Sequence, residues 1–194
     1  MLAYRHAFHA GNHADVLKHL VLTLVLRHMN LKDKGWRCVD THAGAGGYSL
    51  EGDYAKKRGE FEQGIARLWD RGDLPAPLAD YVALVRSFNG GSKLKQYPGS
   101  PALAQLLMRP QDQLRLFELH PTDHKILVSF LGDAPGVEVR MADGFASLKS
   151  QLPPPTRRGV VLIDPSYELK SDYPRALAAL REALARFADA VVIV

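Results

Sequence analysis

The chain has 194 residues, of which 46% are hydrophobic and 24% are charged, and these proportions predict one globular core with room for an inserted subdomain. Its net charge of +4 permits an anionic partner without proving one, and the single cysteine, Cys38, excludes an internal disulfide and fits a reducing cytosol. Because the sequence shows no apolar leader and no apolar run long enough to span a bilayer, we expect a cytoplasmic protein with no membrane partner.

The first predicted helix runs from about Asp15 to His28. Asn12 is a plausible N-cap, because its side chain can accept from the first backbone N–H groups, and Asp15 three residues later completes a pattern like the capping box. Apolar residues at helical spacing predict a wide core face made of Val16, Leu17, Leu20, Val21, Leu24 and Val25.

Four histidines crowd the start of the chain, namely His6, His9, His13 and His19. His9 and His13 are four residues apart, but no third ligand at a helical or turn spacing and no cysteine accompanies them. We therefore expect no metal ion, and we interpret this stretch as a polar segment that lines a site.

A strand is predicted over Trp36–Asp40, followed by the small residues of Thr41–Tyr48. Small residues after a strand let a ligand approach the backbone closely, and a helix after them would direct its N–H groups at that ligand. Gly44 and Gly46 are present, but the third glycine of the dinucleotide fingerprint is missing, which argues against a Rossmann dehydrogenase.

Residues 50–110 interrupt the alternation of strands and helices. Helices predicted at Gly59–Asp70 and Pro77–Phe88 indicate an inserted helical subdomain over residues 51–97, with basic clusters at its rim. The clusters are Lys56–Arg58 and Lys93–Lys95, and the remaining segments, 1–50 and 98–194, form the main domain.

After this interruption Tyr97–Pro101 is predicted to be a turn, with Ser100 as the N-cap of a helix over Pro101–Met108. The alternation then becomes regular and predicts a doubly wound parallel sheet. The expected strands are 114–119, 137–141, 160–163 and 190–194, the last one buried, and the expected helices are 123–131, 145–152 and 173–187. Because the sequence stops within a predicted strand, we expect the sheet to be C-terminally incomplete.

The segment Val160–Ile163 predicts a strand buried on both faces, and it ends abruptly at Asp164 and Pro165. A carboxylate and the Pro165 carbonyl can both accept from one exocyclic NH2 group. Tyr167 could stack on the planar base that carries this group, which is worth roughly 1–3 kcal/mol per base. An ordinary turn would use the same residue types, so this segment alone leaves both interpretations open.

Four successive predicted strands end in an acid, and the acids are Asp40, Glu118, Asp143 and Asp164. In a doubly wound sheet these ends lie along one edge, where ligands bind. We expect Glu118 to accept from two ribose hydroxyls and Asp143 from an adenine amino group. The loop after Asp40 would hold an amino-acid-like tail, and Asp164 would face a second substrate.

This pattern resembles the class I S-adenosylmethionine-dependent methyltransferases, and Asp164–Tyr167 resembles the Asp/Asn-Pro-Pro-Tyr signature of amino-group methyltransferases. More specific segments resemble the bacterial 23S ribosomal RNA adenine-N6 methyltransferase J family over essentially the whole chain. They are Tyr4–His19, Asp40–Gly46, Tyr97–Pro101, Glu118–Pro121 and Asp143–Phe145. Members of that family are longer, which agrees with an incomplete sheet.

The resemblance implies a Rossmann-like methyltransferase sheet, S-adenosylmethionine as cofactor, and methyl transfer to N6 of an adenine in 23S ribosomal RNA. Asp164 would be the catalytic acceptor, while Tyr4, Pro165 and Tyr167 would bind the substrate. The implied cofactor contacts are His19, His42, Ser100, Glu118, Asp143, Gly144 and Asp164. We expect a monomer that acts on naked 23S ribosomal RNA or on an early assembly intermediate.

Two residues depart from the wider patterns. His42 stands where the general methyltransferase loop favours glycine, which implies a different grip on the cofactor tail. Ser166 replaces the usual second proline and makes the turn after Asp164 less rigid.

Two alternatives remain open from the residues themselves. The same pair of acceptors, Asp164 and the Pro165 carbonyl, could bind the amino group of DNA adenine or of a protein glutamine, so a methyltransferase for either substrate is the first alternative. A non-catalytic nucleotide-binding module that docks on RNA is the alternative from a different class.

Overall fold

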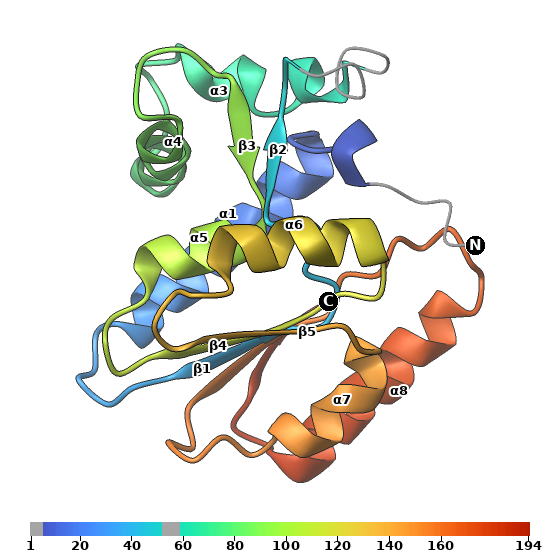
Figure 1. Ribbon diagram of the computed structural model, residues 1–194. Coiled ribbons are helices and arrows are strands. Elements are labelled where there is room, and N and C mark those ends of the chain that lie inside the picture. Colours follow the sequence, from blue (N-terminus) through green and yellow to red (C-terminus); the bar gives the residue numbers. More distant parts are fainter. Residues whose placement is uncertain (1–5, 52–58) are drawn as a thin grey trace.

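Five parallel strands form the sheet at the centre of the computed structural model, which describes residues 6–51 and 59–194 (Figure 1). The strands are β1 (Arg37–Asp40), β4 (Gln113–Phe117), β5 (Val137–Arg140), β6 (Gly159–Leu162) and β7 (Val191–Ile193). Their order is β5-β4-β1-β6-β7, and every neighbouring pair is parallel. The chain therefore builds outward from β1 first in one direction and then in the other, which confirms the doubly wound sheet.

Helices cover both faces of this sheet, as the crossovers between parallel strands require. One face carries α1 (His13–Met29), α5 (Ser100–Leu107) and α6 (Pro121–Leu131), and the other carries α7 (Gly144–Gln151) and α8 (Asp172–Arg186) (Figure 1). A short 3-10 helix, η1 (His6–Phe8), precedes α1. Within residues 6–51 and 59–194, no helix combines the length and the apolar character that crossing a bilayer demands.

The interior strand β6 and Ile163, the residue after it, contribute alternate side chains to two separate cores. Val160 and Leu162 pack in the cluster under α1, α5 and α6, whereas Val161 and Ile163 pack against α7 and α8. All four are at most 1% exposed, as a continuous apolar run predicts for a strand covered on both sides. The Ile163 N–H still donates to the Ile193 carbonyl, so Asp164 is the first residue beyond the sheet.

The glycine-rich loop after β1 leads into a strand and not into a helix, so no helix N-terminus faces a ligand there. This strand, β2 (Gly47–Ser49), pairs antiparallel with β3 (Gln96–Pro98). The chain between them forms η2 (Glu60–Gln63), α3 (Ala66–Trp69) and α4 (Ala76–Asn89). A third apolar cluster lies in this region and also includes residues of the N-terminal segment and α5. Of the two expected basic clusters, Lys56–Arg58 lies outside the described residues.

The helix expected over Gly59–Asp70 is divided into two short pieces, η2 and α3. Gly64 separates them, because its backbone lies directly against the N-terminal segment. A Cβ atom at Gly64 would lie 2.0 Å from the Gly11 carbonyl oxygen, and the Ile65 N–H donates to that same oxygen. The division therefore depends on a contact distant in sequence, which local periodicity does not contain.

The core face predicted for the first helix is only partly right, although the extent of the helix and its Asn12 cap are confirmed. Val16, Leu20 and Val25 are partly buried against the apolar clusters, but the other three predicted residues are not. Leu17 is 65% exposed, and Val21 and Leu24 are exposed as well. The buried residues are Asp15, His19, Leu22, Thr23, Leu26 and Met29. Apolar residues surround most of this helix, so periodicity could not select the buried side. Asp15 also departs from the capping-box pattern, because it accepts from Gly11 N, one residue before the cap.

Two further expectations need correction. Tyr97 and Pro98 belong to β3, and α5 begins at Ser100 with Gly99 as its N-cap, because the Ser100 hydroxyl donates to Asp40 and not to its own helix. The strand expected at the end of the chain exists, but it is not fully buried. It forms the edge of the sheet, and Val191 is 38% exposed.

Candidate active site

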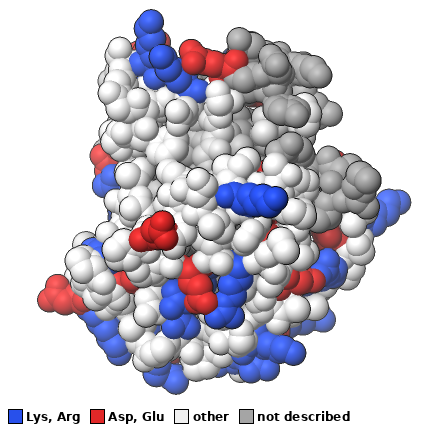
Figure 2. Space-filling model, in the orientation of Figure 1, with Lys and Arg blue, Asp and Glu red and all other residues white. Residues whose placement is uncertain are grey.

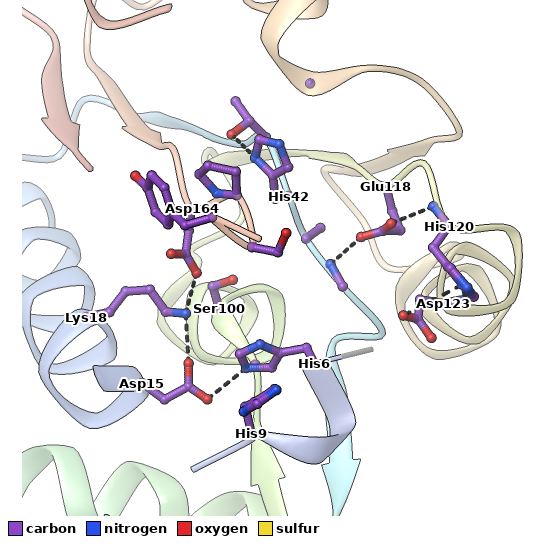
Figure 3. A pocket seen from close by; sticks show the side chains of 18 of the residues that line it. His6, His9, Asp15, Lys18, His42, Ser100, Glu118, His120, Asp123 and Asp164 are labelled. Atoms are coloured by element: carbon purple, nitrogen blue, oxygen red, sulfur yellow. Dashed lines mark hydrogen bonds and ion pairs between the residues drawn. The ribbon is translucent and has the colours of Figure 1, made fainter. Parts of the chain in front are cut away.

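A cavity of about 500 Å³ opens at the carboxyl ends of the strands. It lies beside β1 and β6, where the strand order reverses, and open α/β sheets bind their ligands at this point. The loops Thr41–Gly44, Glu118–His120 and Asp164–Leu169 line it, together with the N-terminal segment and the start of α1 (Figure 3). Residues far apart in sequence thus share one site.

Asp164 is linked through Lys18 and Asp15 of α1 to His6 of η1 (Figure 3). Lys18 Nζ lies 2.5 Å from Asp164 Oδ2 and 2.8 Å from Asp15 Oδ1, and Asp15 Oδ2 lies 2.8 Å from His6 Nε2. Burial disfavours the charged form of Lys18, but the carboxylates of Asp15 and Asp164 outweigh it and raise the pKa of this ammonium. Lys18 therefore stays cationic and fixes one oxygen of Asp164.

The other Asp164 oxygen, Oδ1, has no partner within the described residues, and neither has the Pro165 carbonyl oxygen. These two acceptors come from adjacent residues of one turn, and both residues line the cavity. An amino group with two hydrogens could donate one to each acceptor. The local geometry therefore suits an exocyclic amine.

Tyr167 completes this turn in an unfavourable backbone conformation. Its φ is 55°, in the left-handed region, where a bulky residue costs roughly 1–2 kcal/mol. The ring packs on Tyr173, with ring centroids 4.9 Å apart, and Tyr167 lines the cavity. Strained residues of this kind concentrate at functional sites, which supports the functional interpretation of the turn.

Glu118, just beyond β4, lines the cavity and shapes the loop opposite. Its Oε2 accepts from Gly44 N at 2.8 Å and its Oε1 accepts from His120 N at 2.6 Å (Figure 3). Burial raises the pKa of Glu118, against these two hydrogen bonds, which lower it. Each carboxylate oxygen can accept more than one hydrogen bond, so Glu118 keeps acceptor capacity for a ligand.

Asp40 is buried beneath the loop and is not part of the cavity lining. Its Oδ2 accepts from Ser100 Oγ at 2.6 Å and its Oδ1 accepts from His42 N at 3.1 Å. Burial raises the pKa of Asp40 to about 6, although both hydrogen bonds lower it. Asp40 therefore positions Ser100 and His42, which do line the cavity.

The raised pKa of Asp40 predicts a pH dependence of stability. Between pH values of about 4 and 6 the folded state binds more protons than the unfolded state, so this carboxyl lowers stability as pH rises. Asp40→Asn removes the titration, so the free energy of unfolding of the variant relative to the wild type should increase by up to about 3 kcal/mol from pH 4 to pH 7. Urea denaturation at several pH values measures it. A parallel offset at every pH would contradict the prediction, and Asp133→Asn, at an exposed loop, is the control.

A family model described as "RsmJ: Ribosomal RNA large subunit methyltransferase D, RlmJ" matches residues 33–194 of this chain. The chain belongs to this family. Two curated relatives are both named "Ribosomal RNA large subunit methyltransferase J". The one from Escherichia coli (strain K12) is 50% identical over 191 residues, which is 98% of this chain and 68% of the relative. The one from Haemophilus influenzae is 50% identical over 189 residues, which is 97% of this chain and 67% of the relative.

A solved structure has the same fold. The crystal structure of protein LPL1258 from Legionella pneumophila superposes with a TM-score of 0.88 at 39% identity, over 95% of this chain and 68% of that chain. The chain therefore spans about two thirds of the length of the two curated relatives and of this solved structure.

Most residues predicted for the RlmJ-type site line this same cavity. These residues are His19, His42, Ser100, Glu118, Gly144, Asp164, Pro165 and Tyr167. Asp143 does not line it. This residue caps α7 through Oδ1, and its Oδ2 lies 2.5 Å from Arg175 Nη2. Tyr4 lies outside the described residues.

The sequence analysis missed two partners of this site. The spacing of Asp15 and Lys18 is a signal for an ion pair within α1, but the pairing of Lys18 with Asp164 joins residues 146 positions apart. Arg175 was also missed. It pairs with Asp143 and lies 4.5 Å from the centroid of the Phe145 ring, and no local pattern around it indicates either contact.

Proposed function

We propose that this chain transfers the methyl group of S-adenosylmethionine to N6 of an adenine in 23S ribosomal RNA. The observation that supports this most directly is the turn Asp164–Tyr167 at the cavity of an RlmJ-family chain. The turn combines an aromatic residue with two acceptors that have no hydrogen-bond partner among the described residues. The curated relatives carry the name of a large-subunit ribosomal RNA methyltransferase, which supports the substrate class.

The cavity residues fit S-adenosylmethionine by their chemistry. Glu118 offers carboxylate oxygens to ribose hydroxyls. The loop expected to hold the amino-acid end contains His42, and His19 lines the same cavity. Burial lowers the pKa of His42 to about 4, so this ring is neutral at physiological pH. Asp143 pairs with Arg175 and does not line the cavity, so its contact with the cofactor's adenine amino group would need a movement of the loop after β5.

In this mechanism the residues of the turn hold the amine while the bound cofactor supplies an electrophilic methyl group. Asp164 Oδ1 and the Pro165 carbonyl accept the two N6 hydrogens, which favours a pyramidal nitrogen, and Lys18 keeps the carboxylate in place. The cofactor, when bound, would supply its methyl carbon to N6 as the bond from that carbon to sulfur breaks. The nitrogen would then be positive and would lose one hydrogen as a proton, which Asp164 would accept. Much of the rate would come from positioning.

The substrate base must be unstacked before it reaches this turn, and Tyr167 would stabilise it by stacking. Residues 51–97 are proposed to act as a subdomain beside the site. Charged side chains of both signs are scattered over the face seen in Figure 2, which gives no sign of a single extended basic surface there. We propose naked 23S ribosomal RNA or an early assembly intermediate as substrate, with the protein acting as a monomer.

The proposal is tested by methyl transfer from labelled S-adenosylmethionine to fragments of 23S ribosomal RNA, with single-stranded DNA and glutamine-containing peptides as competitors. We expect label on N6-methyladenine in RNA, identified by mass spectrometry of the nucleosides. Preferred labelling of DNA or peptide would replace the substrate, and RNA binding without any labelling would favour a non-catalytic module.

A further inference from the structure

Three buried polar side chains connect the region between β2 and β3 to the cavity. Tyr81 lies in α4, Tyr97 in β3 and His19 in α1, and each is at most 1% exposed. The Tyr81 and Tyr97 hydroxyl oxygens are 2.7 Å apart, and the Tyr97 oxygen is 2.8 Å from His19 Nδ1. The rings of His19 and Tyr97 are also stacked, with centroids 5.5 Å apart. The imidazole therefore has one fixed orientation.

One end of this chain of hydrogen bonds faces the cavity. His19 lines the cavity, and its Nε2 has no hydrogen-bond partner within the described residues. Burial first, and then the charge of Lys18, lower the pKa of His19 to about 3, so the ring is neutral at physiological pH and carries one proton. Whether Nε2 is a donor or an acceptor therefore depends on which nitrogen holds that proton.

The hydrogen bonds among His19, Tyr97 and Tyr81 can run in either direction, and the two directions differ in whether a hydroxyl hydrogen is left without an acceptor. If His19 donated from Nδ1, Tyr97 would donate to Tyr81, and the Tyr81 hydroxyl hydrogen would have no acceptor within the described residues. If Tyr81 donates to Tyr97 and Tyr97 donates to Nδ1, every hydroxyl hydrogen is accepted. A buried donor without an acceptor is costly, whereas an unused lone pair on a hydroxyl oxygen costs less.

We propose that Tyr97, supported by Tyr81, is a positioning residue that holds His19 as the Nε2–H tautomer, so that this N–H donates to the carboxylate at the amino-acid end of S-adenosylmethionine. The ligand part of this inference rests on the proposed function, whereas the tautomer can be observed without any ligand. Tyr97 itself does not line the cavity, so its hydroxyl would contribute to cofactor recognition only through His19.

The first test is nitrogen-15 NMR of histidine-labelled protein without cofactor, with the His19 signals assigned by their loss in His19→Gln. We expect the proton on Nε2 in the wild type and a shift toward Nδ1 protonation in Tyr97→Phe. A wild-type proton on Nδ1, or an unchanged tautomer in Tyr97→Phe, would overturn the proposal.

The second test compares binding of S-adenosylmethionine with binding of its decarboxylated analogue, by calorimetry. Tyr97→Phe should weaken S-adenosylmethionine binding about 10-fold and leave the analogue unaffected, because only the former has the acceptor for Nε2–H. In a His19→Gln background, whose amide is a donor without help from Tyr97, the same substitution should have little effect. Equal losses for both ligands would overturn the proposal.

Trp69→Phe is the matched control, because it removes a partly buried hydrogen bond in the region between β2 and β3, from Trp69 Nε1 to the Ser92 carbonyl, without touching His19. It should leave both affinities unchanged. If the wild type bound neither ligand and methylated no RNA, the proposed function would fail, while the NMR result would still decide the tautomer.

Discussion

Asp164→Ala is expected to lower kcat for RNA methylation by about 1,000-fold or more while RNA binding stays within about twofold of the wild type. The substitution removes the Oδ1 acceptor and leaves the Pro165 carbonyl to hold the amine alone. The fold should persist, because Asp164 lies beyond the last strand residue and Lys18 keeps Asp15 as its partner. Single-turnover methylation and RNA binding by fluorescence anisotropy separate these two effects.

Asp164→Asn refines the test. An amide keeps one acceptor oxygen, but its NH2 group would face either the amine or the Lys18 ammonium, so activity should fall between that of the wild type and that of Asp164→Ala. Asp133→Ala, an exposed acid before β5, is the control for loss of a negative charge. Methylation by Asp164→Ala within 10-fold of the wild type would exclude the mechanism proposed for this turn.

Gly144→Ala is expected to destabilise the fold by about 3 kcal/mol or more and to weaken S-adenosylmethionine binding. A Cβ atom there would lie 2.0 Å from the Thr41 carbonyl oxygen and 2.6 Å from the Thr41 carbonyl carbon. These are backbone atoms, so either α7 or the loop after β1 must move, and both line the cavity. Thermal unfolding should show a Tm lower by roughly 6–12 °C.

Gly72→Ala provides the matched control, since nothing lies within 4 Å of the added methyl group. Its Tm should stay the same or rise slightly, because alanine restricts the unfolded chain. If Gly144→Ala unfolded at the wild-type temperature and bound cofactor normally, the close packing of α7 on Thr41 would not be a requirement of the site.

The sheet could be predicted from the sequence because its strands carry local signals. Val160–Ile163 is a continuous apolar run, and acids such as Glu118 and Asp164 follow directly where strands end. The same signals brought most of the candidate site together, since parallel strands place their carboxyl ends at one edge. Recognition of family motifs added His19 and Ser100, which the strand ends alone do not indicate.

The errors arose where a distant contact decides local structure. Gly64 divides a predicted helix because the chain at Gly11 lies against it, and α1 buries Asp15 because Lys18 and His6 satisfy its carboxylate. Hydrophobic periodicity contains no information about either partner. Asp143 illustrates the same limit, because it pairs with Arg175, 32 positions away, and does not line the cavity.

The left-handed backbone at Tyr167 has a consequence for protein engineering. Glycine adopts this φ without steric cost, so a search for thermal tolerance would favour glycine at this position. Such a replacement would remove the ring that faces the cavity, and heat resistance would rise as turnover fell. Tyr167 is therefore a residue to hold constant when variants of this enzyme are selected for robustness.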